Sequence, residues 1–298
     1  MSVVSKFYYH TWNIGIIENS ITNIILLNNN TLLSVNWINH NYRDRFFADP
    51  FILDYTESEI QILVEEYPYF KKKGVISLLT VDRKNYNLLK RKVILEQPYH
   101  MSYPYIQRDS SGELWVAPEA SMGGCLYRYN INLESKILEN QEVLLSEPAL
   151  DSTIIEHDGK YWLFCTKRGF DSNKKLYIYY SNTSKGPWLT HTKNPVVDDS
   201  KYARPAGYMV KLNDTIYRFV QKNDISYGET INITKIEELS TVNYKESFVK
   251  QLNCRNSKYS SGFHTINGYK DICVVDGLYK DFAPFRRIWF EFRNKFNL

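Results

Sequence analysis

Acidic side chains next to strand-forming runs are the clearest chemical signal in this 298-residue chain. Asp49 precedes the run Pro50-Phe51-Ile52-Leu53, Asp151 precedes Ser152-Thr153-Ile154-Ile155, and Glu119 follows Leu114-Trp115-Val116-Ala117-Pro118. Paired carboxyl groups can serve as base and acid across a glycosidic bond. We therefore predict Asp49, Asp151 and Glu119 as catalytic residues. The alternative is that such polar groups only satisfy one another, an axial ion or a water.

A second set of polar residues recurs beside the same runs and could hydrogen-bond sugar hydroxyls or offset negative charge. We predict these as substrate-binding residues: Glu65, Glu66, His100, Tyr103, Arg204 and His264. A structural or ion-linked role on an axis is the alternative for His264. No spacing of ligands requires a metal, although an axial divalent ion is compatible with the set. Phosphate-loop, zinc-protease and nucleophile-elbow motifs are missing from the sequence, so no cofactor is identified.

An internal repeat supplies the elements that must position these residues. Units open near residues 48, 102, 150, 203 and 262, and each contains an apolar first strand, a polar turn and an alternating second strand. The aligned positions Pro50, Pro104, Thr153, Pro205 and Thr265 are separated by 54, 49, 52 and 60 residues. Third and fourth strands follow in most units. The pattern predicts an all-β fold, a five-bladed β-propeller.

The last unit is too short to form a whole blade. We expect the N-terminal segments 12–17 and 33–37 to supply its missing strands and to close the ring, so that residues 1–278 form the propeller. Residues 279–298 are expected to form a basic-aromatic C-terminal helix or tail. Because the first strand of each blade lines the central channel, the predicted site residues should converge there. The alternative is an irregular β-sandwich in which the repeated hairpins are coincidental.

Composition narrows the range of functions. The chain has 37 Lys+Arg against 33 Asp+Glu, a net charge of +4, with no long block of like charge, so we predict no nucleic-acid partner. Its cysteines, at 125, 165, 254 and 273, form no Cys-x-x-Cys pair. A signal-peptide pattern and an 18-residue apolar window are both missing, which favours a cytoplasmic protein.

The tail offers a further interpretation. Residues 281–296 combine Arg and Lys with Phe, Trp and Ile, as an interfacial membrane helix would. We therefore expect peripheral contact at the inner face of the cell membrane; the alternative is a basic helix folded against the propeller.

Parts of the sequence resemble five-bladed glycoside hydrolases of the arabinanase, β-xylosidase and invertase type. The resemblance lies at Asp49-Pro50 and over residues 150–164, and it implies a base or nucleophile at Asp49 and an orienting carboxylate at Asp151. In those families a Glu that opens blade four is the general acid. Here that place reads Ala203-Arg204-Pro205, which leaves Glu119 or a neighbouring Glu as the substitute acid.

A closer resemblance covers most of residues 12–278. The sequence is similar to the propeller at the N-terminus of plant glucosamine inositolphosphorylceramide transferase and in its bacterial relatives. The motifs that carry it are Ala48-Asp49-Pro50-Phe51, Val64-Glu65-Glu66-Tyr67, His100-Met101-Ser102-Tyr103-Pro104, Pro118-Glu119-Ala120-Ser121, Asp151-Ser152-Thr153, Asn194-Pro195-Val196-Val197, Ala203-Arg204-Pro205-Ala206-Gly207 and His264-Thr265. This implies sugar handling in glycoconjugate or surface-polysaccharide assembly, including lipopolysaccharide.

These observations lead to the hypothesis of a carbohydrate-active propeller that acts as a glycosyltransferase. The expected partners are a sugar or nucleotide-sugar substrate and a lipid-linked or polysaccharide acceptor. In this hypothesis Asp49 activates the acceptor hydroxyl, Asp151 positions it, and Arg204 with His100 neutralises the leaving group. The alternatives are a glycoside hydrolase of the same fold and a non-catalytic glycan-binding module.

Overall fold

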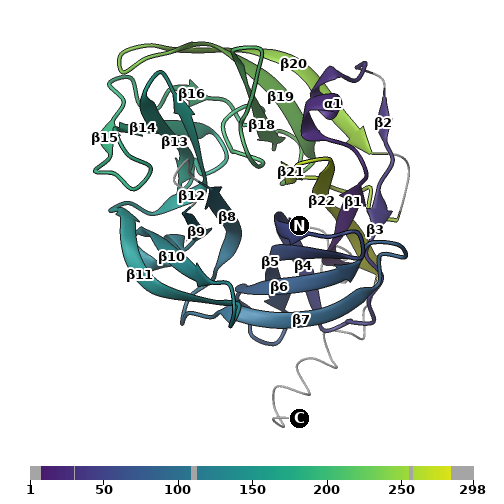
Figure 1. The fold of residues 1–298 in the computed structure, drawn as a ribbon. Coiled ribbons are helices and arrows are strands. Elements are labelled where there is room, and N and C mark those ends of the chain that lie inside the picture. Colours follow the sequence, from purple (N-terminus) through teal and green to yellow (C-terminus); the bar gives the residue numbers. More distant parts are fainter. Residues whose placement is uncertain (1–7, 30, 109–112, 255–257, 283–298) are drawn as a thin grey trace.

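The computed structural model describes residues 8–29, 31–108, 113–254 and 258–282, and it arranges them as five antiparallel sheets around a central axis (Figure 1). Each sheet is one blade whose first strand is innermost. This confirms the predicted five-bladed β-propeller.

The blades follow one another along the chain. Blade one contains β4 (Arg45–Tyr55), β5 (Glu59–Pro68), β6 (Val75–Asp82) and β7 (Leu88–Leu95). Blade two contains β8 (Ser102–Arg108), β9 (Leu114–Glu119), β10 (Leu126–Asn132) and β11 (Ile137–Leu145). Blade three contains β12 (Ala149–His157), β13 (Lys160–Lys167), β14 (Lys175–Ser181), β15 (Leu189–Thr190) and β16 (Val197–Asp198). Blade four contains β17 (Val210–Leu212), β18 (Thr215–Lys222), β19 (Thr230–Leu239) and β20 (Tyr244–Cys254).

Blade five joins the two ends of the chain. Its strands are β21 (Ile266–Tyr269), β22 (Ile272–Phe282), β1 (Tyr8–Ile17) and β3 (Asn36–Trp37), in that order from the axis outward. β1 pairs with β22 along its whole length, from Tyr8 opposite Phe282 to Ile17 opposite Cys273. The predicted N-terminal closure is therefore present, and it removes the sheet edge that an open ring would leave.

Two details of the predicted closure differ. Leu32–Leu33 forms β2, which adds to the outer edge of blade four beside β20, so only residues 36–37 of the second predicted segment join blade five. β22 also continues past the predicted boundary at 278. The rest of the predicted C-terminal helix lies outside the described residues.

Helical structure is limited to short segments within the described chain. Helix α1 (Ile21–Leu26) is capped by the side chain of Ser20, and a 3₁₀ turn covers Ser121–Gly123. Among the described residues, no helix combines the length and the apolar character needed to span a bilayer.

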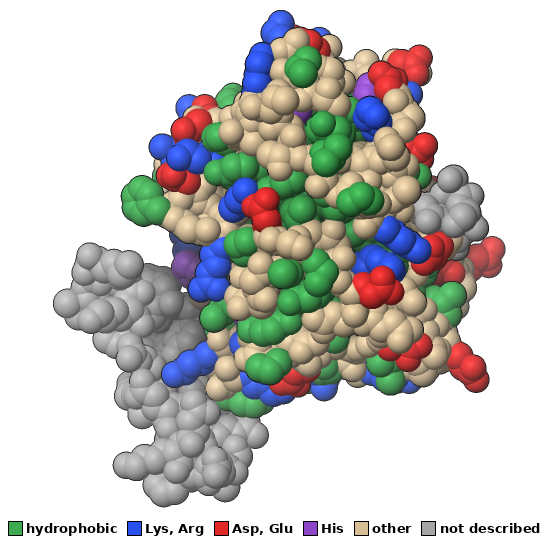
Figure 2. Space-filling view, turned by 90° about the vertical axis from the view of Figure 1, so that its left-hand side faces the viewer, with side chains coloured by type: hydrophobic (Ala, Val, Ile, Leu, Met, Phe, Trp, Pro, Cys, Tyr) green, Lys and Arg blue, Asp and Glu red, His purple; other side chains and the backbone are tan. Residues whose placement is uncertain are grey.

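The core lies between neighbouring blades, where the inner strands β4, β8 and β12 are buried on both faces along most of their length. On the axis, the rings of Phe51, Tyr105 and Tyr208 come from three different blades and pack edge to face, with centroids 5.2–6.1 Å apart. The channel is thus filled at this level. The outer wall shown in Figure 2 has a different character, with single hydrophobic side chains scattered among charges of both signs.

Candidate active site

The first strands of blades one to three share a β-bulge near their start. Regular pairing is interrupted between Ala48 and Phe51 in β4, between Ser102 and Tyr105 in β8, and between Leu150 and Thr153 in β12. Asp49, Tyr103 and Asp151 occupy equivalent places in these bulges, with φ of 51°, 42° and 47°. A left-handed backbone costs a non-glycine residue on the order of 1–3 kcal/mol, and such residues cluster at functional sites.

The bulges also correct the sequence alignment by one residue in blade three. Pro50 and Pro104 are equivalent to Ser152 and not to Thr153, as the positions of Leu150 and Thr153 at the two sides of the bulge show. Asp151 is consequently the true counterpart of Asp49. An extra residue in one strand changes the face to which the next side chains point, which a two-residue periodicity does not reveal.

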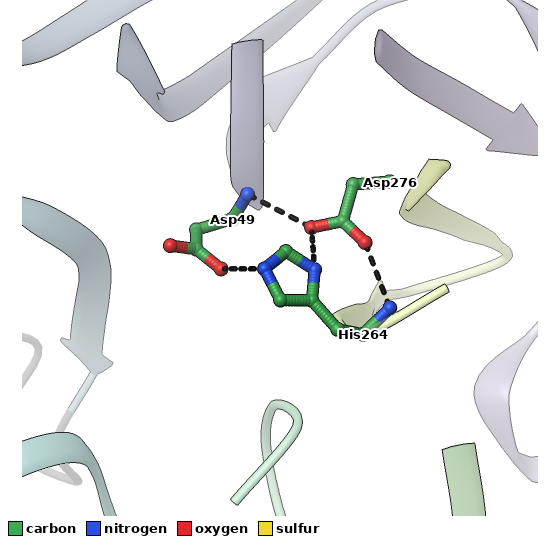
Figure 3. A group of neighbouring side chains, drawn as sticks. All are labelled: Asp49, His264 and Asp276. Atoms are coloured by element: carbon green, nitrogen blue, oxygen red, sulfur yellow. Dashed lines mark hydrogen bonds and ion pairs between the residues drawn. The ribbon is translucent and has the colours of Figure 1, made fainter. Parts of the chain in front are cut away.

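Asp49, His264 and Asp276 form a buried network at the junction of blades one and five (Figure 3). The Asp276 carboxylate accepts hydrogen bonds from the backbone N–H groups of Asp49, His264 and Thr265, at 3.0–3.1 Å. The Nδ1 atom of His264 lies 2.7 Å from Asp276 Oδ2, and its Nε2 atom lies 3.6 Å from Asp49 Oδ1. The imidazole thus bridges two carboxylates.

Protonation in this network follows from its burial and its charges. Burial raises the pKa of Asp49 to about 6, and the charges of Asp151 and Asp276 act in the same direction, against His264 and the hydroxyl of Thr265. Burial alone would lower the pKa of His264, but the charge and hydrogen bond of Asp276 outweigh it and raise that pKa. The raised pKa of His264 favours the protonated imidazole in its place between Asp49 and Asp276.

A second cluster surrounds the guanidinium of Arg204. Its Nε atom donates to Asp151 Oδ2 at 2.5 Å, Nη1 donates to Asn173 at 3.0 Å, and Nη2 lies 3.7 Å from Glu119 Oε2. Gln221 also donates to Asp151 Oδ2, at 2.7 Å. The site therefore contains a fixed cation at the position where the glycoside hydrolase pattern requires an acid.

Two further carboxyl groups near these clusters have pKa values well above the usual range. Burial and the charge of Asp151 raise the pKa of Glu119 well above its usual range, against the attraction of Arg204, and a hydrogen bond with Asp151 adds to the rise. Burial and then the charge of Asp49 raise the pKa of Glu65 in the same way. The clustered carboxyl groups cannot all ionise together in a buried site.

The structure brings most of the predicted site residues together. His100 lies 3.6 Å from Glu65 and accepts a hydrogen bond from the Gly74 N–H, and burial lowers its pKa, so its imidazole is neutral at pH 7. This corrects the expectation that His100 supplies positive charge. Tyr103 supports Asp49 through its backbone N–H at 3.2 Å, while its buried hydroxyl bonds Thr153.

Glu66 lies apart from the site, although it neighbours Glu65. Its carboxylate is enclosed by Arg45, Arg91 and the Ser77 hydroxyl. Successive side chains of a strand point to opposite faces, so only one of the two glutamates can face the axis.

Sequence reasoning missed Asp276, the most buried carboxylate of the site. A signal for it existed. Glu65 and Glu119 lie near the ends of second strands, opposite Ala48 and Ser102. In the second strands of blades five and four, the backbone N–H groups of Asp276 and Gln221 donate to the carbonyl groups of Thr265 and Arg204, near the openings of those blades. Applying the rule for second-strand ends to every blade finds both residues.

The residues that could hold a cation are Asp49, His264 and Asp276, whose ligand atoms all lie within 4.8 Å of one another. Three backbone N–H groups and the imidazolium already satisfy the Asp276 carboxylate. A metal would have to displace the proton of His264, because only neutral imidazole is a ligand. The donor set is therefore explained as an ion-pair network.

Comparison with known proteins agrees with this geometry. The family described as glucosamine inositolphosphorylceramide transferase 1, N-terminal, matches residues 15–273. The chain belongs to this family. Proteins named glucosamine inositolphosphorylceramide transferase 1 are 30% identical over 218 residues in Oryza sativa subsp. japonica and 28% identical over 226 residues in Arabidopsis thaliana. These matches cover 69% and 73% of this chain but only 28% and 29% of those proteins, so the chain spans less than a third of their length.

Solved structures share the fold of this family member at low sequence identity. A thermostable family-43 glycoside hydrolase is 14% identical with a TM-score of 0.55, and the match covers 76% of this chain and 85% of that one. An α-L-arabinofuranosidase from Podospora anserina is 9% identical with a TM-score of 0.57, over 77% and 80% of the two chains. Both resemblances noted in the sequence are thereby confirmed.

The neighbours Glu65 and Glu66 provide a matched test of the electrostatics. The pKa of Glu65 is raised in the folded state, so the ionisation of Glu65 lowers the stability of the fold as the pH rises. Glu65→Gln cannot ionise and avoids this loss of stability. We expect this variant to melt a few degrees above wild type at pH 8, with a difference that shrinks towards pH 4.5. Glu66→Gln removes the buried acidic partner of two half-buried arginines, of which Arg45 keeps Asp44, and should lose about 1–3 kcal/mol. Melting curves against pH measure both, and equal behaviour of the two variants would contradict the assignment.

Asp276 should be indispensable for the stability of the ring junction. In Asp276→Asn an amide group faces the backbone N–H donors, and His264 loses its acidic partner. We therefore expect the free energy of unfolding to fall by about 3–5 kcal/mol and the pKa of His264 to fall as well. Denaturant melts and an NMR titration of the imidazole measure these effects. Asp158→Asn, on a side chain that is 79% exposed, is the control and should change neither quantity.

Proposed function

We propose that this chain transfers a glycosyl group to a hydroxyl acceptor at the site formed by Asp49, Glu119, Asp151 and Arg204. Its family carries the name of a transferase that acts on a glycoconjugate, and its fold is shared with glycoside hydrolases, so both likenesses are to carbohydrate-active proteins. The proposal itself depends on the chemistry of the site.

The observation that carries it is a set of carboxyl groups with different protonation states. Asp49, with a pKa of about 6, is mostly ionised at pH 7, whereas the pKa of Glu119, raised well above its usual range, favours the protonated form. Environments that separate the pKa values of two acids assign one as base and the other as acid. Glycosyl transfer needs the base to activate the acceptor hydroxyl, and the acid assists a leaving group that requires a proton.

In the proposed step Asp49 removes the proton of the acceptor hydroxyl. The acceptor oxygen then forms a bond to the anomeric carbon while the bond from that carbon to the leaving oxygen breaks. Glu119 gives its proton to the leaving oxygen, and Arg204 Nη2, 3.7 Å from Glu119 Oε2, offsets the charge that develops there. Asp151 holds Arg204 in place, and a donor with a phosphate leaving group suits that cation.

Glycoside hydrolysis is the second candidate, and the neutral Glu119 specifically favours it, because a sugar leaving group needs a proton donor. The same residues would act, with water in place of the acceptor hydroxyl. The two candidates differ in their donor, since a nucleotide leaves readily without a proton. A glycan-binding module would bind sugars and turn over neither class of donor.

The test compares wild type with Asp49→Asn and with Asp54→Asn, the same change on an exposed side chain at the other end of β4. Nucleoside diphosphate and monophosphate sugars, and p-nitrophenyl glycosides, are first screened by their effect on the melting temperature. Turnover is then measured on the donors that bind. We expect a nucleotide sugar to bind and react, with Asp49→Asn at least about a hundredfold slower and Asp54→Asn unchanged.

Reaction with glycosides alone would replace transfer by hydrolysis. Binding without turnover in wild type would leave the glycan-binding module. Equal rates in wild type and Asp49→Asn would remove Asp49 from the mechanism.

A further inference from the structure

The loops that join second to third strands lie at one end of the propeller, around the site. They are residues 69–74, 120–125, 168–174 and 223–229 in blades one to four. Arg45 pairs with Pro68 and Ala149 with Lys167, so each of these loops begins beside the start of a first strand, where Asp49 and Asp151 stand. We call the surface that these four loops form the mouth face.

Side chains from the same loops reach the catalytic clusters. Asn173 accepts from Arg204, and the guanidinium of Arg204 lies 5.3 Å from the ring centroid of Tyr227. The N–H of Gly74 bonds His100, and Ser121 lies 3.4 Å from Glu119. Whatever contacts the mouth face is therefore next to the site.

Each of the four loops exposes a large apolar side chain. Phe170 is fully exposed, Ile225 is 80% exposed, Met122 57% and Phe70 41%. Single exposed hydrophobic residues on outer strands are ordinary, and this chain has several. In the four complete blades, however, every loop between the second and third strands carries one exposed apolar side chain. Exposed apolar groups gathered around a site indicate a contact surface.

Charge and chain ends at the mouth face indicate the kind of partner. Lys71, Lys72 and Lys73 follow Phe70 in the loop of blade one, where Lys71 and Lys73 share the single carboxylate of Glu96, so the loop keeps a net positive charge. The first and last residues of the described chain, Tyr8 and Phe282, pair with each other, and both lie at the end of the propeller that carries the mouth face. The sequence after Phe282 is rich in Arg, Lys, Phe and Trp, a composition typical of segments that bind anionic lipid surfaces.

We propose that the mouth face docks on a lipid bilayer that carries anionic headgroups, with Phe70, Met122, Phe170 and Ile225 inserted at the interface. The site then opens onto the membrane, and the acceptor that enters it is attached to a lipid; this last point depends on the proposed transfer function. Side chains that stand alone in water gain by entering the apolar boundary, and lysines beside them gain from the anionic surface.

The experiment is sedimentation of the full chain with vesicles of phosphatidylcholine and phosphatidylglycerol at 7:3, and of phosphatidylcholine alone. We expect binding to the anionic vesicles and a loss of about tenfold or more in Phe170→Ser/Ile225→Ser. The matched control is Leu133→Ser/Val242→Ser, two residues that are 54% and 53% exposed in third-to-fourth strand turns at the opposite end. The control should bind like wild type, and Lys72→Glu should weaken binding to the anionic vesicles only.

No binding by wild type, or equal loss in both double variants, would overturn the docking proposal. So would self-association that Phe170→Ser/Ile225→Ser abolishes in the absence of vesicles, since the mouth face would then be a protein contact. The effect of soluble nucleotide sugars on the melting temperature of the same variant keeps the two proposals distinguishable. If Phe170→Ser/Ile225→Ser still binds the donor but no longer binds vesicles, docking is supported. If wild type binds the donor but no vesicles, the docking proposal alone is wrong.

Discussion

One buried carboxylate, that of Asp276, ties the closure of the ring to the geometry of the site. It belongs to β22, the strand that pairs with the N-terminal β1, and it accepts the backbone N–H of Asp49 from blade one. That bond holds Asp49 in its left-handed bulge, and the ion pair with His264 fixes the imidazole beside the Asp49 carboxylate. A fully buried charge with these partners is stable only while the first and last blades are joined.

The site then follows from how buried charges limit one another. The axis brings five carboxyl groups near two cations, Arg204 and His264, and burial makes full ionisation of the carboxyl groups costly. Asp276 and Asp151 have the shortest contacts with His264 and Arg204, while burial and neighbouring charges raise the pKa values of Glu65 and Glu119 well above their usual range. The pKa of Asp49 is raised to about 6, where a base for chemistry at neutral pH is useful.

The repeat in the sequence was sufficient to predict the five blades, the N-terminal closure and the convergence of Asp49, Asp151, Glu119 and Arg204, because strand order and spacing determine which residues face the axis. Three features were not predictable from that pattern. Blade three aligns with blades one and two only through the shared bulge, which puts Ser152 and not Thr153 at the place of Pro50. The adjacent Glu65 and Glu66 separate to opposite faces, and Asp276 becomes a partner of Asp49 only through packing between blades. Each depends on contacts between residues that are distant in the chain.

The most direct test of this account is a pH titration of the side-chain carboxyl carbons by ¹³C NMR, with Asp49→Asn and Glu119→Gln used to assign the signals. The account predicts an Asp signal with a midpoint near pH 6 that is lost in Asp49→Asn, and a Glu signal that is still protonated at pH 7 and lost in Glu119→Gln. Ionisation of every Glu by pH 5.5, or no Asp titrating near pH 6, would contradict the acid and base assignments on which the proposed transfer rests.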